Sequence, residues 1–134
     1  MTSKYTRTGA RRSGDDYQDI IALDELVEMI KHPARYKWIQ VEADDAGFLD
    51  DIVALKSDDK IIAKQVKFST NSDNEDDFWT LEKLVKKEKG KDGKQKMSLL
   101  EKWEYSFFDL KRNKLIYNIS VVSNKRASFE LQNI

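Results

Sequence analysis

Residues 48–68 read FLDDIVALKSDDKIIAKQVKF, and this stretch predicts a β-hairpin. Its first arm, 52–55, and its second arm, 61–68, are rich in apolar and β-branched residues, which favour strands. The polar run 57–60 between the two arms is typical of a turn. The rest of the chain can be placed relative to this hairpin.

The polar side chains of the hairpin are expected to gather at one end of the sheet. Side chains two residues apart in a strand share a face, so Asp51 lies with Val53 on the first arm. On the second arm Gln65 and Lys67 share a face with Ala63. If the two faces coincide, a carboxylate, an amide and an ammonium meet, and burying these charges is costly unless they pair or hold a metal. The residues alone leave both interpretations open: an Asp–Lys ion pair at a sheet edge, or a metal site for cutting phosphodiesters.

Composition excludes several kinds of site. The 134 residues suffice for one domain with a single core. Cysteine is absent and His32 is the only histidine, which excludes disulfides, Cys- or His-based zinc sites and a Ser-His triad. Any metal must be held by oxygen ligands, which favours magnesium or manganese. No apolar run reaches membrane-spanning length and the N-terminus is no signal peptide, so we expect a cytoplasmic protein without a membrane partner.

The charges are balanced overall but unevenly distributed. The formal net charge is zero, so bulk charge does not indicate a nucleic-acid partner. Basic residues nevertheless precede the first acid and recur through the run 83–96, and we expect residues 1–12 to form a flexible basic arm ahead of a domain at 13–134. Such runs are most often solvated faces, but an arm and a loop of this kind would also suit a phosphate backbone.

The remaining periodicity predicts further elements on both sides of the hairpin. A helix over 14–31 should open at the capping-box-like Ser13 and end at His32-Pro33, with its apolar stripe facing the core. The other predicted elements are a strand over 37–43, helical segments over 78–87 and 97–109 separated by a glycine-containing loop, and a strand over 115–122. The last strand is the most apolar, so we expect it to be central and covered on both faces.

This order predicts an α/β fold with a mixed sheet flanked by helices. The connection from the hairpin to the last strand passes through helices, which allows parallel pairing. The chain stops soon after that strand with Phe129, Leu131 and Ile134 still apolar, so we expect it to be the N-terminal domain of a longer protein.

The helix–strand–strand–strand–helix–strand order, with Asp51 opening the second strand and Gln65-Val66-Lys67 on the third, resembles the PD-(D/E)xK, or restriction-endonuclease-like, nucleases. The Gln-x-Lys form resembles the Mrr-like branch and archaeal junction resolvases. With Gly14-Asp15-Asp16-Tyr17-Gln18 opening a helix and Val41-Glu42 on a strand, the succession resembles the double-stranded-DNA endonuclease effector domains of bacterial anti-phage defence proteins. The resemblance covers residues 12 to 68 at motif level and the rest by element order.

The resemblance implies a role for each of these residues. Asp51 is the implied metal carboxylate, with Asp50 as its rival, and Lys67 would orient the attacking water and balance charge on the scissile phosphate. The other implied participants are the Gln65 side chain and the Val66 carbonyl at the metal, Glu42 as a second carboxylate, and Gln18 reaching in from the helix.

The implied activity is magnesium-dependent cutting of double-stranded DNA with low sequence specificity, manganese being a possible substitute. The DNA contacts would come from Arg11, Arg12, Gln18, Lys86 and Lys87. Proteins of this kind carry a C-terminal sensor or NTPase region, and we expect activation by homo-oligomerisation. Gln65 stands where Glu is commonest in the family, which removes one ligand charge. This leaves open a degenerate module of the same fold that only binds nucleic acid. A third alternative is a structural or interaction domain in which the hairpin charges form a surface ion pair, and Asp51 and Lys67 on opposite faces of the sheet would support it.

Overall fold

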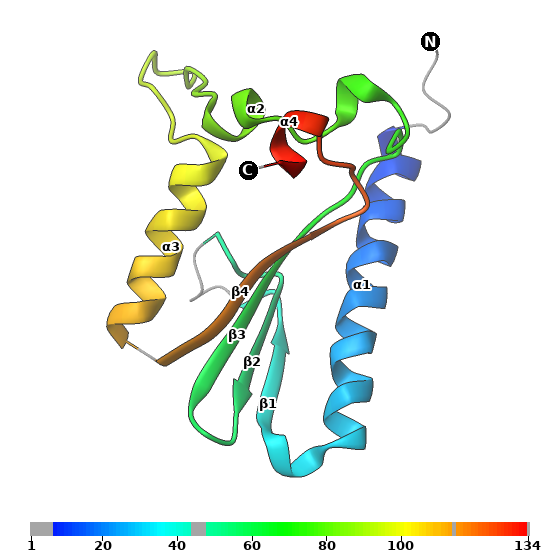
Figure 1. The fold of residues 1–134 in the computed structure, drawn as a ribbon, viewed down its shortest axis with the longest axis vertical. Helices are drawn as coiled ribbons and strands as arrows, with labels where there is room; N and C mark the ends of the chain where they lie inside the picture. Colours follow the sequence, from blue (N-terminus) through cyan, green and yellow to red (C-terminus); the bar gives the residue numbers. More distant parts are fainter. Residues whose placement is uncertain (1–6, 44–47, 114, 134) are drawn as a thin grey trace.

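A four-stranded sheet lies between two long helices in the computed structural model, which describes residues 7–43, 48–113 and 115–133 (Figure 1). The strands are β1 (Tyr36–Val41), β2 (Ile52–Lys56), β3 (Lys60–Lys67) and β4 (Leu115–Ser123), in that spatial order. The first three are antiparallel and β4 runs parallel to β3. This arrangement confirms the predicted mixed sheet of a restriction-endonuclease-like core.

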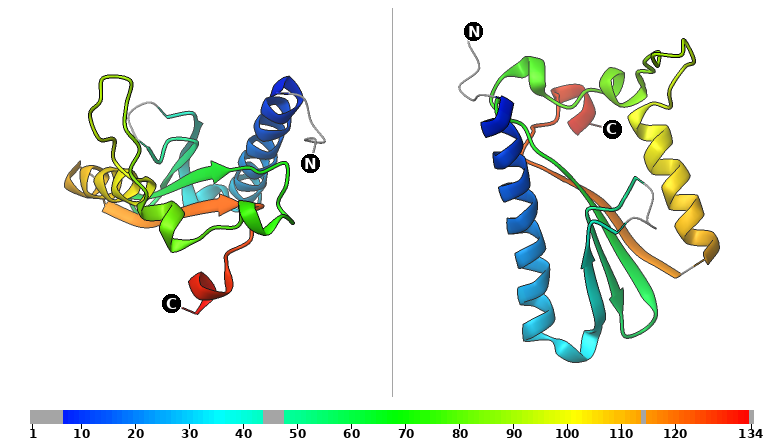
Figure 2. Two further views of the ribbon diagram at one scale, coloured as in Figure 1. Left: turned by 90° about the horizontal axis from the view of Figure 1, so that it is seen from above. Right: turned by 180° about the vertical axis from the view of Figure 1, so that it is seen from behind.

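The two long helices, α1 (Arg7–Lys31) and α3 (Leu99–Asn113), lie on opposite sides of the sheet in both directions of view in Figure 2. The shorter elements are η1 (Pro33–Arg35), η3 (Glu75–Asp77), α2 (Leu81–Val85) and α4 (Phe129–Gln132). The bottom of the sheet, as drawn in Figure 1, carries the β2–β3 turn. The end of β3, the start of α1, α2 and the beginning of α3 all lie toward the top.

The core forms on the face of the sheet that meets α3. Alternation along β3 buries Ile61 and Ala63, and Val53 of β2 lies directly opposite Ala63. These side chains cluster with Leu49 and with Leu110 of α3. The other face of β3 meets α1, because Lys64 pairs there with Glu25.

The prediction of a flexible basic arm is wrong for residues 7–12, the part of the arm that the structure describes. Helix α1 begins at Arg7 rather than at Gly14, so residues 7–12 are helical, while residues 1–6 lie outside the described part. Arginine and alanine at 10–12 are good helix formers. Ser13 is not a cap: it lies inside the helix, and its hydroxyl donates a hydrogen bond to the Gly9 carbonyl at 2.9 Å.

Most of the apolar stripe predicted to bury α1 faces outward instead. Ile20, Leu23, Val27 and Ile30 are 62%, 57%, 43% and 69% exposed. The helix contacts the sheet through a different face, on which Glu25 is buried against β1 and β3. The buried Glu25 carboxylate therefore determines which face of α1 turns toward the sheet. Hydrophobic periodicity alone does not predict this face.

Strand β4 is an edge strand, not the central strand that its apolar sequence suggested. In the described part of the chain it pairs only with β3, and Val121 is 37% exposed. The predicted helix over 78–87 is also shorter, because Thr80 caps α2 by accepting a hydrogen bond from the Lys83 N–H at 3.2 Å. Residue Trp79 before it is extended and bonded to the Arg126 carbonyl.

Candidate active site

The Asp51 carboxylate lies at the start of β2, across from Gln65 on β3. The β2–β3 register pairs Val53 with Ala63 and Ile52 with Lys64, and continuing it places Asp51 opposite Gln65. Oδ2 of Asp51 accepts hydrogen bonds from the Gln65 side-chain amide and from the Val66 N–H, the latter at 2.5 Å. The structure thus brings together the carboxylate and the amide, which the sequence placed on one face only if the faces of the two arms coincide.

This geometry follows from where the β2–β3 ladder ends. The last paired residue of β2 is Ile52, so the Val66 N–H has no strand partner on that side and the Asp51 side chain takes its place. A strand residue directs its N–H and C=O to the same side, so the Val66 carbonyl also faces the gap occupied by Asp51. Two hydrogen bonds therefore hold the Asp51 carboxylate in place, and the Val66 carbonyl borders the same gap.

The donor set fits a hard divalent cation. Magnesium and manganese prefer carboxylate, amide and carbonyl oxygens, all of which occur at Asp51, Gln65 and Val66. Oδ2 of Asp51 is occupied by its two donors, whereas Oδ1 accepts no hydrogen bond from the residues that the structure describes. Gln65 is 7% exposed, so a cation held here would be partly shielded from water.

Lys67 lies two residues beyond Gln65 on the same face of β3. Its backbone is anchored to β4, because the Ser123 hydroxyl donates to the Lys67 carbonyl at 2.6 Å. Residue Lys67 is half-buried as a whole, and its ammonium makes no hydrogen bond or ion pair with the described residues. Asp51 and Lys67 therefore share a face without pairing, which contradicts both the surface ion pair and the opposite-face arrangement expected of a structural domain.

Neither Asp50 nor Glu42 shares the hydrogen bonds of the Asp51 carboxylate to Gln65 and Val66. The main chains run side by side here: the Glu42 N–H donates to the Asp51 carbonyl at 2.9 Å and the Ala43 N–H to the Asp50 carbonyl at 2.7 Å. Glu42 has a φ of +54°, in the left-handed region, which ends β1 at Val41 rather than at Ala43 as predicted. Its side chain is exposed and makes no hydrogen bond or ion pair with the residues that the structure describes. Within the described ranges no three acidic or histidine side chains cluster as a metal site.

Gln18 is half-buried on α1 and lacks a hydrogen bond to Asp51, Gln65 or Lys67 in the described part of the chain. The helix approaches β3 from the opposite face, where the Tyr17 and Phe68 rings lie 5.5 Å apart. Gln18 is thus near the end of β3, but no contact connects it to the candidate site.

Sequence reasoning missed a buried ion pair directly behind the site. Lys64 donates to Oε2 of Glu25 at 2.6 Å, and the Tyr36 hydroxyl donates to Oε1 at 2.8 Å. The Glu25 and Lys64 side chains are 7% and 20% exposed. The pair anchors β3 to α1 one residue before Gln65. The only signal in the sequence is a glutamate within the apolar pattern of a helix.

Burial and hydrogen bonding together shift the pKa values of Glu25 and Tyr36. Burial alone would raise the pKa of Glu25, but hydrogen bonds from Lys64 and Tyr36 hold it below its ordinary value of 4.5. Burial, together with the hydrogen bond to the Glu25 carboxylate, raises the pKa of Tyr36 to about 12. Glu25 is therefore ionised and Tyr36 protonated at neutral pH.

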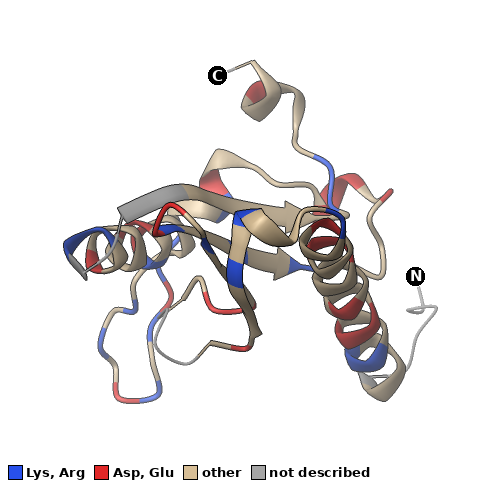
Figure 3. Ribbon diagram, turned by 90° about the horizontal axis from the view of Figure 1, so that it is seen from below, with Lys and Arg blue, Asp and Glu red and all other residues tan. Residues whose placement is uncertain are grey.

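The predicted DNA-binding cations lie at the same end of the molecule as the candidate site. Arg11 and Arg12 are exposed in the first turns of α1, and Lys86 and Lys87 are exposed just after α2 (Figure 1). Lys87 is engaged with Glu101 at 2.5 Å. Figure 3 shows acidic residues along α1 beyond its first turns, whereas lysines dominate the loop between α2 and α3.

Comparison with protein families identifies a match over most of the chain. The family model described as "Cap4, dsDNA endonuclease domain" matches residues 10–134, a range that contains Asp51, Gln65 and Lys67. No curated protein and no solved structure matches the chain. Among the described helices, none has the length and apolarity needed to cross a membrane.

Proposed function

This chain belongs to the family of Cap4 dsDNA endonuclease domains, PD-(D/E)xK-type nuclease effectors of anti-phage defence, and on that premise we propose that its cutting depends on a divalent metal. The metal is Mg²⁺, with Mn²⁺ as a substitute, and the cut has low sequence specificity. The observation that carries the proposal is the Asp51 carboxylate bonded to Gln65 and Val66, with Lys67 on the same face.

The residues divide the chemistry between them. Asp51, the Gln65 side chain and the Val66 carbonyl would hold the cation, which polarises a phosphoryl oxygen and lowers the pKa of bound water. The Lys67 ammonium would stabilise negative charge that develops on the scissile phosphate. Low specificity is proposed because the available cations are lysines and arginines, whose contacts to phosphates carry no sequence information.

The complete protein is proposed to be a cytoplasmic homo-oligomer with a C-terminal sensor or NTPase region. The location follows from the DNA substrate. Support for self-association comes from α1, where Ile20, Leu23, Val27 and Ile30 recur at heptad spacing and are exposed. Such a seam suits a matching helix, and a second copy of this chain supplies one.

Plasmid cleavage tests the metal dependence. Supercoiled plasmid is incubated with the protein in Mg²⁺, in Mn²⁺ and in EDTA, and nicked and linear products are measured. We expect cutting in both metals and none in EDTA. Lys67→Ala should slow cutting by roughly a hundredfold or more. Lys60→Ala, at the other end of the same strand, is the matched control and should leave the rate unchanged.

A second candidate function is favoured by the neutral Gln65 and by the exposed position of Glu42: a domain of this family that has kept DNA binding and lost cutting. DNA binding without cleavage in either metal, in the oligomeric protein, would support that function and overturn the nuclease proposal. Equal cutting in EDTA would overturn the metal dependence.

A further inference from the structure

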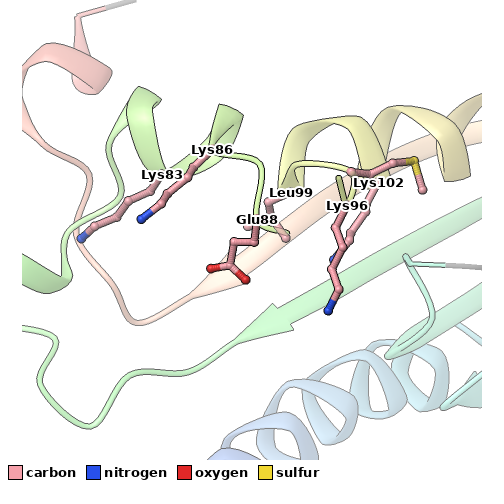
Figure 4. Close-up of a pocket in the computed structure, with 7 residues that line it drawn as sticks. Lys83, Lys86, Glu88, Lys96, Leu99 and Lys102 are labelled. Carbon is pink, nitrogen blue, oxygen red and sulfur yellow. The ribbon is translucent and has the colours of Figure 1, made fainter. Parts of the chain in front are cut away.

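A hollow of about 320 Å³ opens between α2, the following loop and the start of α3 (Figure 4). Its lining contains four lysines (Lys83, Lys86, Lys96 and Lys102) and a single acid, Glu88. Figure 4 shows Lys83 and Lys86 on one side of Glu88, and Lys96 and Lys102 on the other. Gathering ammonium groups in this way is unfavourable unless an anion neutralises them.

The four lysines differ in what holds them. The Lys83 ammonium donates to the backbone carbonyls of Asp76 and Phe78, the latter at 2.8 Å, so it fastens α2 to the segment before it. The Lys102 ammonium lies 5.5 Å from the centre of the Phe48 ring. Lys83 is therefore a structural anchor, and Lys102 is directed toward the loop that carries the candidate site.

Lys86 and Lys96 are exposed, and their ammonium groups make no hydrogen bond or ion pair with any residue that the structure describes. The backbone of Lys96 is nevertheless fixed, because its N–H donates to the Glu88 carbonyl at 2.8 Å and closes the loop. Neighbouring Lys87 is neutralised by Glu101. The cations available to a ligand in the hollow are thus Lys86 and Lys96, rather than the adjacent pair Lys86 and Lys87.

The hollow is joined to the candidate active site through α3. The Phe48 N–H donates to the Ser106 hydroxyl of α3 at 2.8 Å, and Phe48 lies three residues before Asp51. The elements that line the hollow, α2 and the start of α3, lie toward the same end of the sheet as the end of β3 (Figure 1). An extended polyanion that reaches Lys67 can therefore continue along this end of the molecule toward the hollow.

We propose that this hollow binds a backbone phosphate of double-stranded DNA away from the scissile phosphate, through Lys86 and Lys96. The proposal rests on the proposed nuclease function, since that function supplies the polyanion. Binding here would hold the duplex while Asp51, Gln65 and Lys67 act on another phosphate. Glu88 limits the positive charge of the empty hollow.

The test is DNA binding measured without cutting. The affinity of the protein for a short fluorescent duplex is measured in EDTA over a series of salt concentrations. Each phosphate contact contributes about 0.9 to the slope of log affinity against log salt. Because the hollow is proposed to bind one backbone phosphate, the variant Lys86→Gln/Lys96→Gln should lower the magnitude of the slope by about 1. The matched control is Lys31→Gln/Lys111→Gln, which removes the same charge at the far ends of α1 and α3 and should leave the slope unchanged.

An unchanged slope in Lys86→Gln/Lys96→Gln, or an equal reduction in the control variant, would overturn the proposal. Inorganic phosphate is the alternative ligand. Binding of phosphate to the wild type but not to the Lys86→Gln/Lys96→Gln variant, without any displacement of duplex at equal ionic strength, would assign the hollow to free phosphate instead. Failure of the nuclease function gives a different result, which is wild-type cutting absent in Mg²⁺ with the binding slopes intact.

Discussion

Asp51 has two roles at the scale of single residues. Its Oδ2 completes the β2–β3 pairing by accepting bonds from Gln65 and Val66, and its Oδ1 is the proposed contact to a cation. One oxygen therefore fixes the position of the other, which is the kind of preorganisation that a metal site needs. Two predictions follow at this scale, one from the site and one from the ion pair behind it.

Gln65→Glu should make the stability of the folded protein depend on bound Mn²⁺. The variant loses the amide donor to Asp51 and places two carboxylates together, so in EDTA its free energy of unfolding should fall by about 1.5–3 kcal/mol. Mn²⁺ should restore stability more strongly than it stabilises the wild type, because the variant has a second charged ligand. Thermal unfolding in EDTA and in Mn²⁺ measures both effects. Gln95→Glu, on the exposed loop, is the control. If Mn²⁺ stabilises Gln65→Glu no more than it stabilises this control, the proposed metal site is contradicted.

Tyr36 should titrate at high pH. Its pKa is raised from an ordinary 10.0 to about 12 in the folded protein. A raised pKa means that the fold favours the protonated phenol, so this contribution to stability is complete below pH 10 and is lost as the pH rises toward 12. The difference in phenolate absorbance between wild type and Tyr36→Phe should have a midpoint near 12. Glu25→Gln should move that midpoint toward 10, and a midpoint near 10 in the wild type would exclude the hydrogen bond to Glu25.

Among the residues of the candidate site, those placed by local strand geometry were predictable and those placed by tertiary contacts were not. Strand alternation predicted that Gln65 and Lys67 share a face, since period-two geometry depends only on local backbone. That Asp51 meets them depends on the register of β2 against β3, which alternation does not fix. The exposed, left-handed Glu42 was not predictable, because its φ depends on how the β1–β2 connection closes. The Glu25–Lys64 pair joins residues that are 39 positions apart, and local patterns carry no signal for such a contact.

At the scale of elements, the order of helices and strands was predictable and their exposure was not. Turn and strand signals located the hairpin, and the helical connection correctly indicated that β4 pairs in parallel with β3. The rotation of α1 and the edge position of β4 were predicted wrongly, because each depends on tertiary contacts: Glu25 against β3, and the lack of a further strand among the described residues. The N-terminal extension of α1 offers a direct test.

Gly14→Ala should stabilise the protein by about 0.5–1 kcal/mol, because Gly14 lies inside α1 and alanine is the better helix former. An added Cβ would lie 4.0 Å from Phe68, an ordinary contact. Gly93→Ala is the opposite control, since Gly93 has a φ of +75° and the substitution should destabilise. Chemical denaturation measures both, and destabilisation by Gly14→Ala would indicate that the helix begins at this residue instead.

At the scale of the whole molecule, acidic residues and lysines concentrate on different elements. Acidic residues follow the first turns of α1, whereas lysines line the loop and the hollow near α3 (Figure 3). DNA should therefore approach from the α3 side of the candidate site, and the outer face of α1 remains available for contact with another subunit. This division lets substrate binding and self-association use different surfaces.

Substituting the α1 stripe should dissociate the proposed oligomer. The variant Leu23→Ser/Val27→Ser changes two exposed positions, so folding should be nearly unaffected while the helix–helix seam is lost. Sedimentation should show an oligomeric wild type and a monomeric variant with the same circular dichroism. Leu100→Ser/Tyr105→Ser changes two exposed positions on α3 and should leave the oligomer intact. A monomeric wild type would refute the seam.

The most direct test of the central claim compares two adjacent aspartates. Initial rates of plasmid nicking in Mg²⁺ are measured for wild type, Asp51→Asn and Asp50→Asn, each checked for unchanged folding. The account predicts that Asp51→Asn slows nicking by at least about a hundredfold, because it removes the proposed charged metal ligand. Asp50→Asn should retain most of the wild-type rate, since the carboxylate bonded to Gln65 and Val66 is that of Asp51. Loss of nicking in Asp50→Asn with retention in Asp51→Asn would contradict the account.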